Sequence, residues 1–104
     1  MSDATKDRPD ERWAASSHVH CREFDGELVM LDLESGQYFA LEGSGVRMWE
    51  GLAAGRSPSE IARDLAREYD VAESVAATDC IRLAEDLVGR GLLVRKDGSE
   101  RGAL

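Results

Sequence analysis

Long apolar runs are missing from the sequence, and their absence limits where the chain can act. Residues 1–13 contain no hydrophobic stretch of the kind that a secretory signal needs. No segment approaches the length of a membrane span. We therefore expect a cytoplasmic protein with no membrane partner.

Cysteine is also scarce: Cys21 and Cys80 are the two in the chain, and in a reducing compartment we expect both to be free thiols.

The signatures of catalysis and of cofactor binding are missing as well. The sequence has no nucleophile elbow, and "GSG" at residues 43–45 is too short for a phosphate-binding loop. His18, His20 and Cys21 stand close together, and with Cys80 they could make a zinc site. Their spacing is not that of a structural zinc motif, and the alternative is a pair of surface histidines on an edge strand. We expect no enzymatic activity, no bound metal and no cofactor.

Positive charge is in short supply. The chain has 13 basic and 21 acidic residues, which gives a formal net charge of −8. Such a field repels phosphate backbones and anionic membranes, and it favours neutral or basic partners. The negative net charge is evidence against a DNA-binding regulator, because a DNA-binding protein needs a basic stripe on the surface that faces the DNA. The last predicted helix sets Asp79, Glu85 and Asp86 against Arg82 and Arg90.

What the sequence does contain is the pattern of one small α+β domain. Its 104 residues suffice for one compact unit and are too few for two ordinary ones. Short apolar runs separated by the turn signals "DG" and "ESG" predict strands over residues 18–24, 27–33 and 37–41. The middle strand is apolar on both sides, which indicates that both of its faces are covered.

Three helices follow the predicted strands. Ser44 is suited to cap the first helix. "SPSE" at residues 57–60 is a capping box with proline in the first helical position, and it opens the second. The third covers about residues 73–90 and is closed by Gly91, after which the chain could return as a short wing strand. This order predicts a three-stranded antiparallel sheet packed on a three-helix winged helix-turn-helix.

The two ends of the chain are polar and lack hydrophobic periodicity. We therefore predict a disordered arm over residues 1–16, a folded domain over residues 17–95 and a flexible tail over residues 96–104. Trp13 lies in the predicted arm, where it could dock onto the domain or onto a partner.

The last predicted helix carries two apolar stripes, whereas a surface helix needs one to face its core. Either the helix is central and both stripes are buried, or one stripe is kept for a partner. The first stripe is Ala76, Cys80, Leu83 and Leu87, and the second is Ala77, Ile81, Ala84 and Val88.

In their order and spacing these features resemble the PqqD-like domains, which are also called recognition elements of ribosomally made, post-translationally modified peptides. The match lies in "LDLESGQYFAL", in the glycine-bearing turn into a helix with Trp49, and in "GRSPSEI" at the start of the next helix. It continues with Asp79 and with "LVGRGLL" at the end of the last helix. The resemblance covers about Val19 to Val94, most of the predicted ordered chain.

The resemblance implies a binding module without chemistry of its own. Family members hold the leader segment of a precursor peptide as an added strand beside the third strand, lying along the third helix, and deliver it to a processing enzyme. A small free-standing member resembles the B1-type proteins of lasso-peptide pathways, which implies a leader peptidase and a macrolactam-forming synthetase as partners. Radical-SAM and cyclodehydratase partners stay open, as does a subunit that only scaffolds enzymes.

An open strand edge gives this implied role a physical basis, because its N–H and C=O groups can pair with an extended peptide. We expect the groove between the third strand and the second stripe of the last helix. There, small side chains leave room for the guest and acidic ones favour basic groups. Tyr38 suits either core packing or the lining of this groove. The predicted peptide-binding residues are Gln37, Tyr38, Phe39, Ala40, Leu41, Ala76, Asp79, Cys80, Leu83, Ala84, Asp86 and Leu87.

Overall fold

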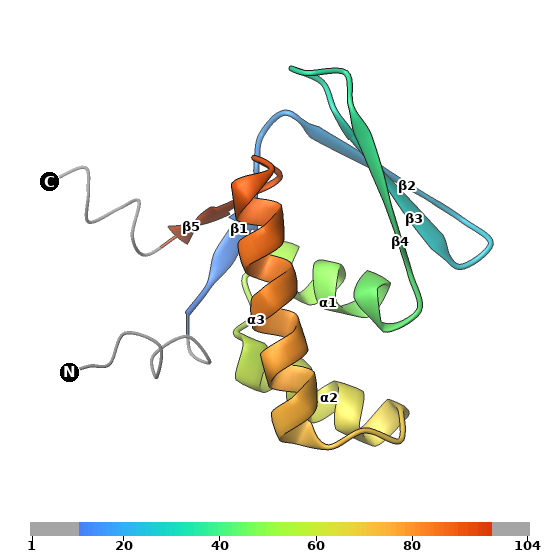
Figure 1. The fold of residues 1–104 in the computed structure, drawn as a ribbon, viewed down its shortest axis with the longest axis vertical. Coiled ribbons are helices and arrows are strands. Elements are labelled where there is room, and N and C mark those ends of the chain that lie inside the picture. Colours follow the sequence, from blue (N-terminus) through green and yellow to red (C-terminus); the bar gives the residue numbers. More distant parts are fainter. Residues whose placement is uncertain (1–10, 97–104) are drawn as a thin grey trace, which may run out of the picture.

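The computed structural model describes residues 11–96 (Figure 1). Turn and capping signals divide this part of the chain into two sheets and three helices. The three-stranded antiparallel sheet followed by three helices confirms the predicted α+β fold. In chain order the elements are β1 (Trp13–Ala15), β2 (Val19–Phe24), β3 (Glu27–Asp32), β4 (Tyr38–Glu42), α1 (Ser44–Ala53), α2 (Pro58–Glu68), α3 (Glu73–Gly89) and β5 (Leu93–Arg95).

The main sheet has the strand order β2-β3-β4, and both pairs are antiparallel. Its first hairpin turns at Gly26, whose φ of +78° suits a residue without a side chain. In β3, Leu28 and Met30 are buried, whereas Val29 and Leu31 on the opposite face are half-buried. The expectation that both faces of this strand are covered therefore holds for one face only.

Capping determines where the helices begin. The Ser57 hydroxyl accepts the Glu60 N–H at 3.3 Å, and the Glu60 carboxylate accepts the Ser57 N–H at 3.0 Å, which confirms the capping box of α2. The prediction for α1 is wrong by one residue: its N-cap is Gly43, not Ser44, and no side chain caps it. The chain turns after β4 with a φ of +59° at Gly43, which glycine adopts without strain.

The segment before β2 differs from the disordered arm that the sequence predicts. Trp13 is fully buried and opens β1, which pairs antiparallel with β5. The Ser16 hydroxyl donates to the Gly91 carbonyl at 2.7 Å and ties the end of this segment to the end of α3. Residues 11–16 thus belong to the folded unit, because the burial of an indole offsets the entropy lost in ordering a short strand.

The end of α3 follows the sequence signals. Gly91 has a φ of +79°, and the chain then returns as β5, the predicted wing strand. Of the predicted arm, residues 1–10 lie outside the described part of the chain, and so do residues 97–104 of the predicted tail.

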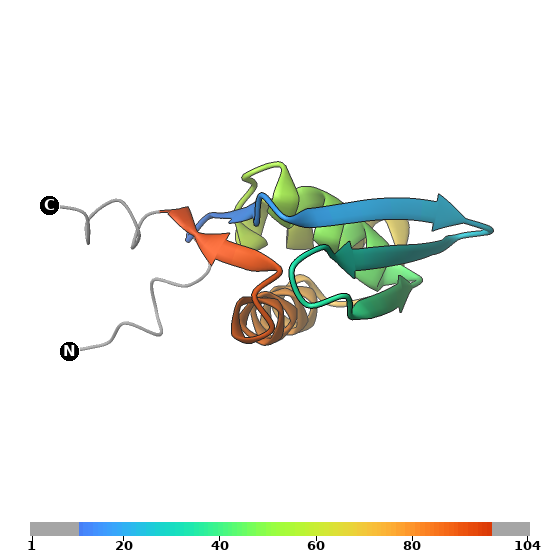
Figure 2. The ribbon, with the colours of Figure 1, turned by 90° about the horizontal axis from the view of Figure 1, so that it is seen from above.

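One core joins the two sheets to the helices. Figure 2 shows β4 as the outer strand of its sheet on the side where α3 lies. Helices α1 and α2 approach closely at Gly51, where an added Cβ would lie 2.6 Å from the Ile61 Cγ1 atom. The buried core is made of Trp13, Leu28, Met30, Val46, Met48, Trp49, Leu52, Ile61, Ala62, Leu65, Ala76, Cys80, Ala84, Leu87, Leu92 and Leu93.

Candidate functional site

Strand β4 has a free margin, because no strand of residues 11–96 pairs with the side that faces away from β3. The register tells which backbone groups lie there. The Asp32 N–H donates to the Gln37 carbonyl at 2.9 Å, so this pair is hydrogen-bonded, and such pairs alternate with non-bonded ones along an antiparallel ladder. Tyr38, Ala40 and Glu42 therefore direct their N–H and C=O groups away from β3. We call these groups the β4 margin.

The side chains of β4 alternate between the core and solvent. Phe39 and Leu41 are half-buried and pack against the core. Ala40 is exposed, as is Gln37 in the turn before the strand. The Tyr38 side chain is 71% exposed, so this residue is not part of the core. An extended peptide at the β4 margin would therefore meet a row of exposed and half-buried side chains.

One flank of α3 faces β4. Asp79, Leu83, Asp86 and Arg90 follow one another at spacings of four, three and four residues, which places them in one row along the helix. At the end of this row, the Arg90 Cζ atom lies 4.7 Å from the centroid of the Phe39 ring. Arg90 is not among the residues predicted from the sequence, although its spacing from Asp79 and Asp86 places it in the same row. We call this row the α3 flank.

A pocket of about 210 Å³ lies at the other end of the α3 flank, where β4 leads into α1. The polar residues Asp79 and Ser44 belong to its wall, and most of the wall is apolar. Sequence reasoning missed most of this wall, because its residues come from three helices and a loop. The lining residues are Ser44, Met48, Leu65, Tyr69, Val71, Ala76 and Asp79.

Four predicted peptide-binding residues are buried. Ala76, Cys80, Ala84 and Leu87 are at most 2% exposed and belong to the core. Burial raises the pKa of the Cys80 thiol to about 12. The prediction is wrong for direct contact at Cys80, Ala84 and Leu87, because a guest cannot reach these side chains while the helices stay packed. Ala76 contributes to the pocket wall, with 2% of its surface exposed.

The second apolar stripe of α3 does not face β4. Val88 and Arg90 lie about 160° apart around the helix axis, because two successive steps turn by about 200°. Ala77, Ile81 and Val88 are half-buried on that other shoulder. The prediction that the second stripe faces β4 is therefore wrong, because the contact of Arg90 with Phe39 places the α3 flank on that side of the helix.

The cysteines and histidines do not form a centre. Cys21 is exposed on β2 and Cys80 is buried, so the two thiols are separate and free. The two nitrogens of the His18 ring lie 3.7 Å from Asp32 Oδ1 and 3.8 Å from Glu34 Oε2. Within residues 11–96 no cluster of three or more potential metal ligands exists. Across the same residues, no helix has the length and apolar character needed to cross a membrane.

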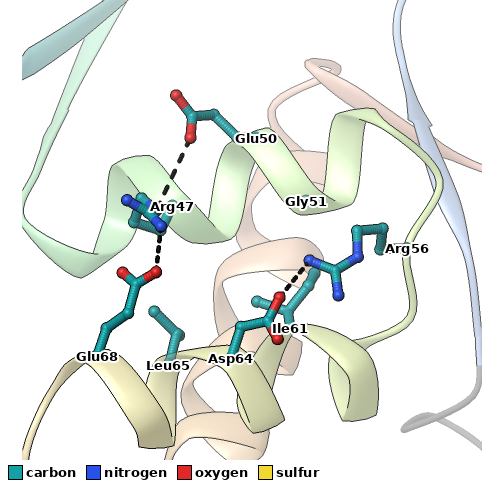
Figure 3. Close-up of a pocket in the computed structure, with 8 residues that line it drawn as sticks. All are labelled: Arg47, Glu50, Gly51, Arg56, Ile61, Asp64, Leu65 and Glu68. Atoms are coloured by element: carbon teal, nitrogen blue, oxygen red, sulfur yellow. Dashed lines mark hydrogen bonds and ion pairs between the residues drawn. The ribbon is translucent and has the colours of Figure 1, made fainter.

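A second pocket, between α1 and α2, is lined by charged side chains that pair with one another (Figure 3). Arg47 pairs with Glu68 and lies 4.0 Å from Glu50. Arg56 pairs with Asp64 at 2.8 Å. Because both arginines are already matched by carboxylates, this pocket offers little positive charge to a phosphate group.

Comparisons with known proteins agree on one family. Residues 27–93 match the family described as "Coenzyme PQQ synthesis protein D (PqqD)". The structure "TbiB1 in Complex with the TbiA(beta) Leader Peptide" is 32% identical with a TM-score of 0.71, over 77% of this chain and 93% of that chain. "Lasso peptide synthetase B1 complexed with the leader peptide" is 26% identical with a TM-score of 0.74, over 80% and 98%. No curated protein matches the chain.

Proposed function

The chain belongs to the PqqD family, and from this premise we propose that it binds the leader segment of a ribosomally made precursor peptide as an added strand on β4. The observation that carries the proposal is the β4 margin, whose backbone groups meet no other strand of residues 11–96. Both similar proteins were solved with a leader peptide bound, which supports the same class of guest for this chain.

Backbone pairing supplies affinity with little demand on the guest sequence. Tyr38, Ala40 and Glu42 offer donors and acceptors at alternate positions, the pattern that an extended strand satisfies. The guest would lie between this margin and the α3 flank, where Leu83 is half-buried and Asp79 and Asp86 are exposed.

Side-chain specificity would come from the pocket at the end of the α3 flank. Its apolar wall suits an apolar or aromatic guest side chain, and the Asp79 carboxylate favours a hydroxyl or basic group at the tip of that side chain. A well-filled anchor of this kind contributes about 2 kcal/mol. Two or three such contacts give binding in the micromolar range after the cost of ordering the guest.

We propose that the chain itself is no enzyme and presents the bound precursor to one. The B1-type neighbours favour a leader peptidase and a macrolactam-forming synthetase as the partner enzymes. A radical-SAM or cyclodehydratase enzyme is the alternative, because the PqqD family match alone does not distinguish these partners.

A proline on the β4 margin tests the proposal. Ala40→Pro removes one outward N–H and places a ring where the guest backbone would lie, while leaving the bonded pairs between β3 and β4 intact. Cys21→Pro is the matched control: Cys21 lies opposite Met30 in a non-bonded pair with β3, so its N–H points to the outer side of β2.

The measurement is fluorescence anisotropy with the labelled TbiA(beta) leader peptide as the first probe, and with a peptide of the same composition in scrambled order as the second. We expect micromolar binding of the first probe by the wild type and by Cys21→Pro, and a loss of roughly tenfold or more in Ala40→Pro. Equal binding by all three proteins would place the guest elsewhere. Salt-sensitive binding of duplex DNA without binding of either peptide would favour the DNA-binding alternative.

A further inference from the structure

Arg90 occupies the end of the α3 flank that lies beside Phe39. Its guanidinium is stacked over the Phe39 ring, with Cζ 4.7 Å from the ring centroid. The Nε atom donates to Asp86 Oδ2 at 3.2 Å. These two contacts fix the plane and the position of the guanidinium next to the first residues of β4, although the side chain remains 46% exposed.

The terminal nitrogens of Arg90 are available to a ligand. An arginine presents five N–H donors in a rigid fork. The Asp86 carboxylate accepts the hydrogen bond from the Arg90 Nε–H. Within residues 11–96 the two terminal nitrogens of Arg90 have no hydrogen-bond partner. Their paired N–H groups match the two oxygens of a carboxylate in a bidentate arrangement.

The charges around Arg90 make it distinct within the site. The α3 flank otherwise offers Asp79 and Asp86, and the β4 margin ends with the exposed Glu42. A guest carboxylate placed next to any of these three would be repelled. At the Phe39 end it meets the guanidinium instead, so the site is electrostatically different at its two ends.

We propose that Arg90 is a specificity-determining residue that binds a guest carboxylate, an Asp or Glu side chain of the leader, beside Phe39. This inference rests on the proposed function and deepens it by assigning one chemical class to one position of the guest. Arg90 follows Asp79 by eleven positions along the helix, which corresponds to a rise of about 16 Å. An extended chain covers that distance in about five residues. The guest acid therefore lies about five residues from the side chain that fills the pocket at Asp79.

Substitution of Arg90, which removes its guanidinium, tests the inference. Arg90→Gln keeps a polar side chain of moderate length but removes the charge and the bidentate donors. Arg63→Gln is the control for the change in net charge, because Arg63 is exposed on α2 and lies outside the proposed site. Arg90→Lys keeps the charge without the fork. The melting temperature of each variant verifies that the fold is intact.

Anisotropy titrations use the full chain and the labelled TbiA(beta) leader peptide, with each Asp and Glu of that leader replaced in turn by Asn or Gln. We expect Arg90→Gln to lose roughly tenfold in affinity and Arg63→Gln to bind like the wild type. Loss of one guest carboxylate should cost the wild type a similar factor and cost Arg90→Gln nothing further, the signature of a coupled pair. Arg90→Lys should recover part of the loss.

The outcomes separate the two proposals. Tight binding by Arg90→Gln, or independent effects of Arg90 and of every guest carboxylate, would overturn the inference and leave the leader-binding function intact. A wild type that binds no leader at all would contradict the proposed function together with the inference.

Discussion

Among single residues, Asp32 holds the turn that leads into β4. Its Oδ1 atom accepts the N–H of Glu34 at 2.9 Å and that of Ser35 at 3.4 Å, and His18 Nε2 lies 3.7 Å away. The bond from the Glu34 N–H, followed by those from Ser35 and by the nearby His18, lowers the pKa of the Asp32 carboxyl below its ordinary value. The carboxylate therefore stabilises the fold above its unfolded pKa, and this contribution is lost as the pH falls through the folded pKa.

We expect Asp32→Asn to weaken the acid sensitivity of the fold, because the amide oxygen still accepts both N–H groups but has no charge to lose. Between neutral pH and about pH 3, below the ordinary Asp pKa of about 3.9, the melting temperature should fall less in the variant than in the wild type. Circular dichroism measures it. Glu34→Gln is the control, since it removes a 73% exposed carboxylate from the same turn. Equal effects of the two substitutions would contradict the role of Asp32.

Among the secondary-structure elements, those with local signals were predictable and those made by distant contacts were not. The Ser57 capping box specifies the start of α2 within four residues of sequence. Strand β1 has three residues and pairs with β5 at the other end of the chain, so no local alternation could reveal it. On α3, both Leu83 and Ala84 are apolar, and the sequence does not say which one faces inward. In the structure Ala84 is buried, whereas Leu83 is half-buried and lies on the α3 flank.

The strand half of the site was predicted more fully than the helix half. A strand has two faces, so the alternation from Gln37 to Leu41 limits the possibilities, and the third strand lies at the sheet margin as expected. A helix that is apolar over a wide arc leaves its orientation undetermined until its neighbours are known. The contact of Arg90 with Phe39 provides that orientation. Peptide contact at Tyr38, Asp79, Leu83 and the other surface residues stays a prediction.

Strand β1 also leads to a stability prediction. Trp13 is fully buried, and within the described residues its Nε1 donor has no hydrogen-bond partner. We expect Trp13→Ala to lower the free energy of unfolding by about 3–5 kcal/mol, through lost contacts and the cavity that remains. Trp13→Phe should cost less, because it keeps most of the apolar contact and removes the unpartnered donor. Guanidinium unfolding measures both. A Trp13→Ala midpoint equal to that of the wild type would show that β1 does not stabilise the domain.

In the molecule as a whole, the main sheet has two margins that no other strand of residues 11–96 pairs with, and they differ in what lies beside them. On the outer side of β2, Val19, Cys21 and Glu23 direct their backbone groups outward. Strand β4 has the α3 flank and the pocket close to its margin, so a guest gains side-chain contacts there in addition to backbone pairing. This asymmetry explains why we assign the guest to β4.

The most direct test of this assignment is residue-resolved amide hydrogen exchange by NMR, with and without the TbiA(beta) leader peptide. In the free protein the Tyr38 and Ala40 amides should exchange fast, because they point away from β3. On addition of the leader we predict that exchange slows at both amides, while the Cys21 and Glu23 amides on the outer side of β2 exchange as before. Bound leader with unchanged exchange at Tyr38 and Ala40, or slowing at Cys21 and Glu23 instead, would contradict strand addition at β4.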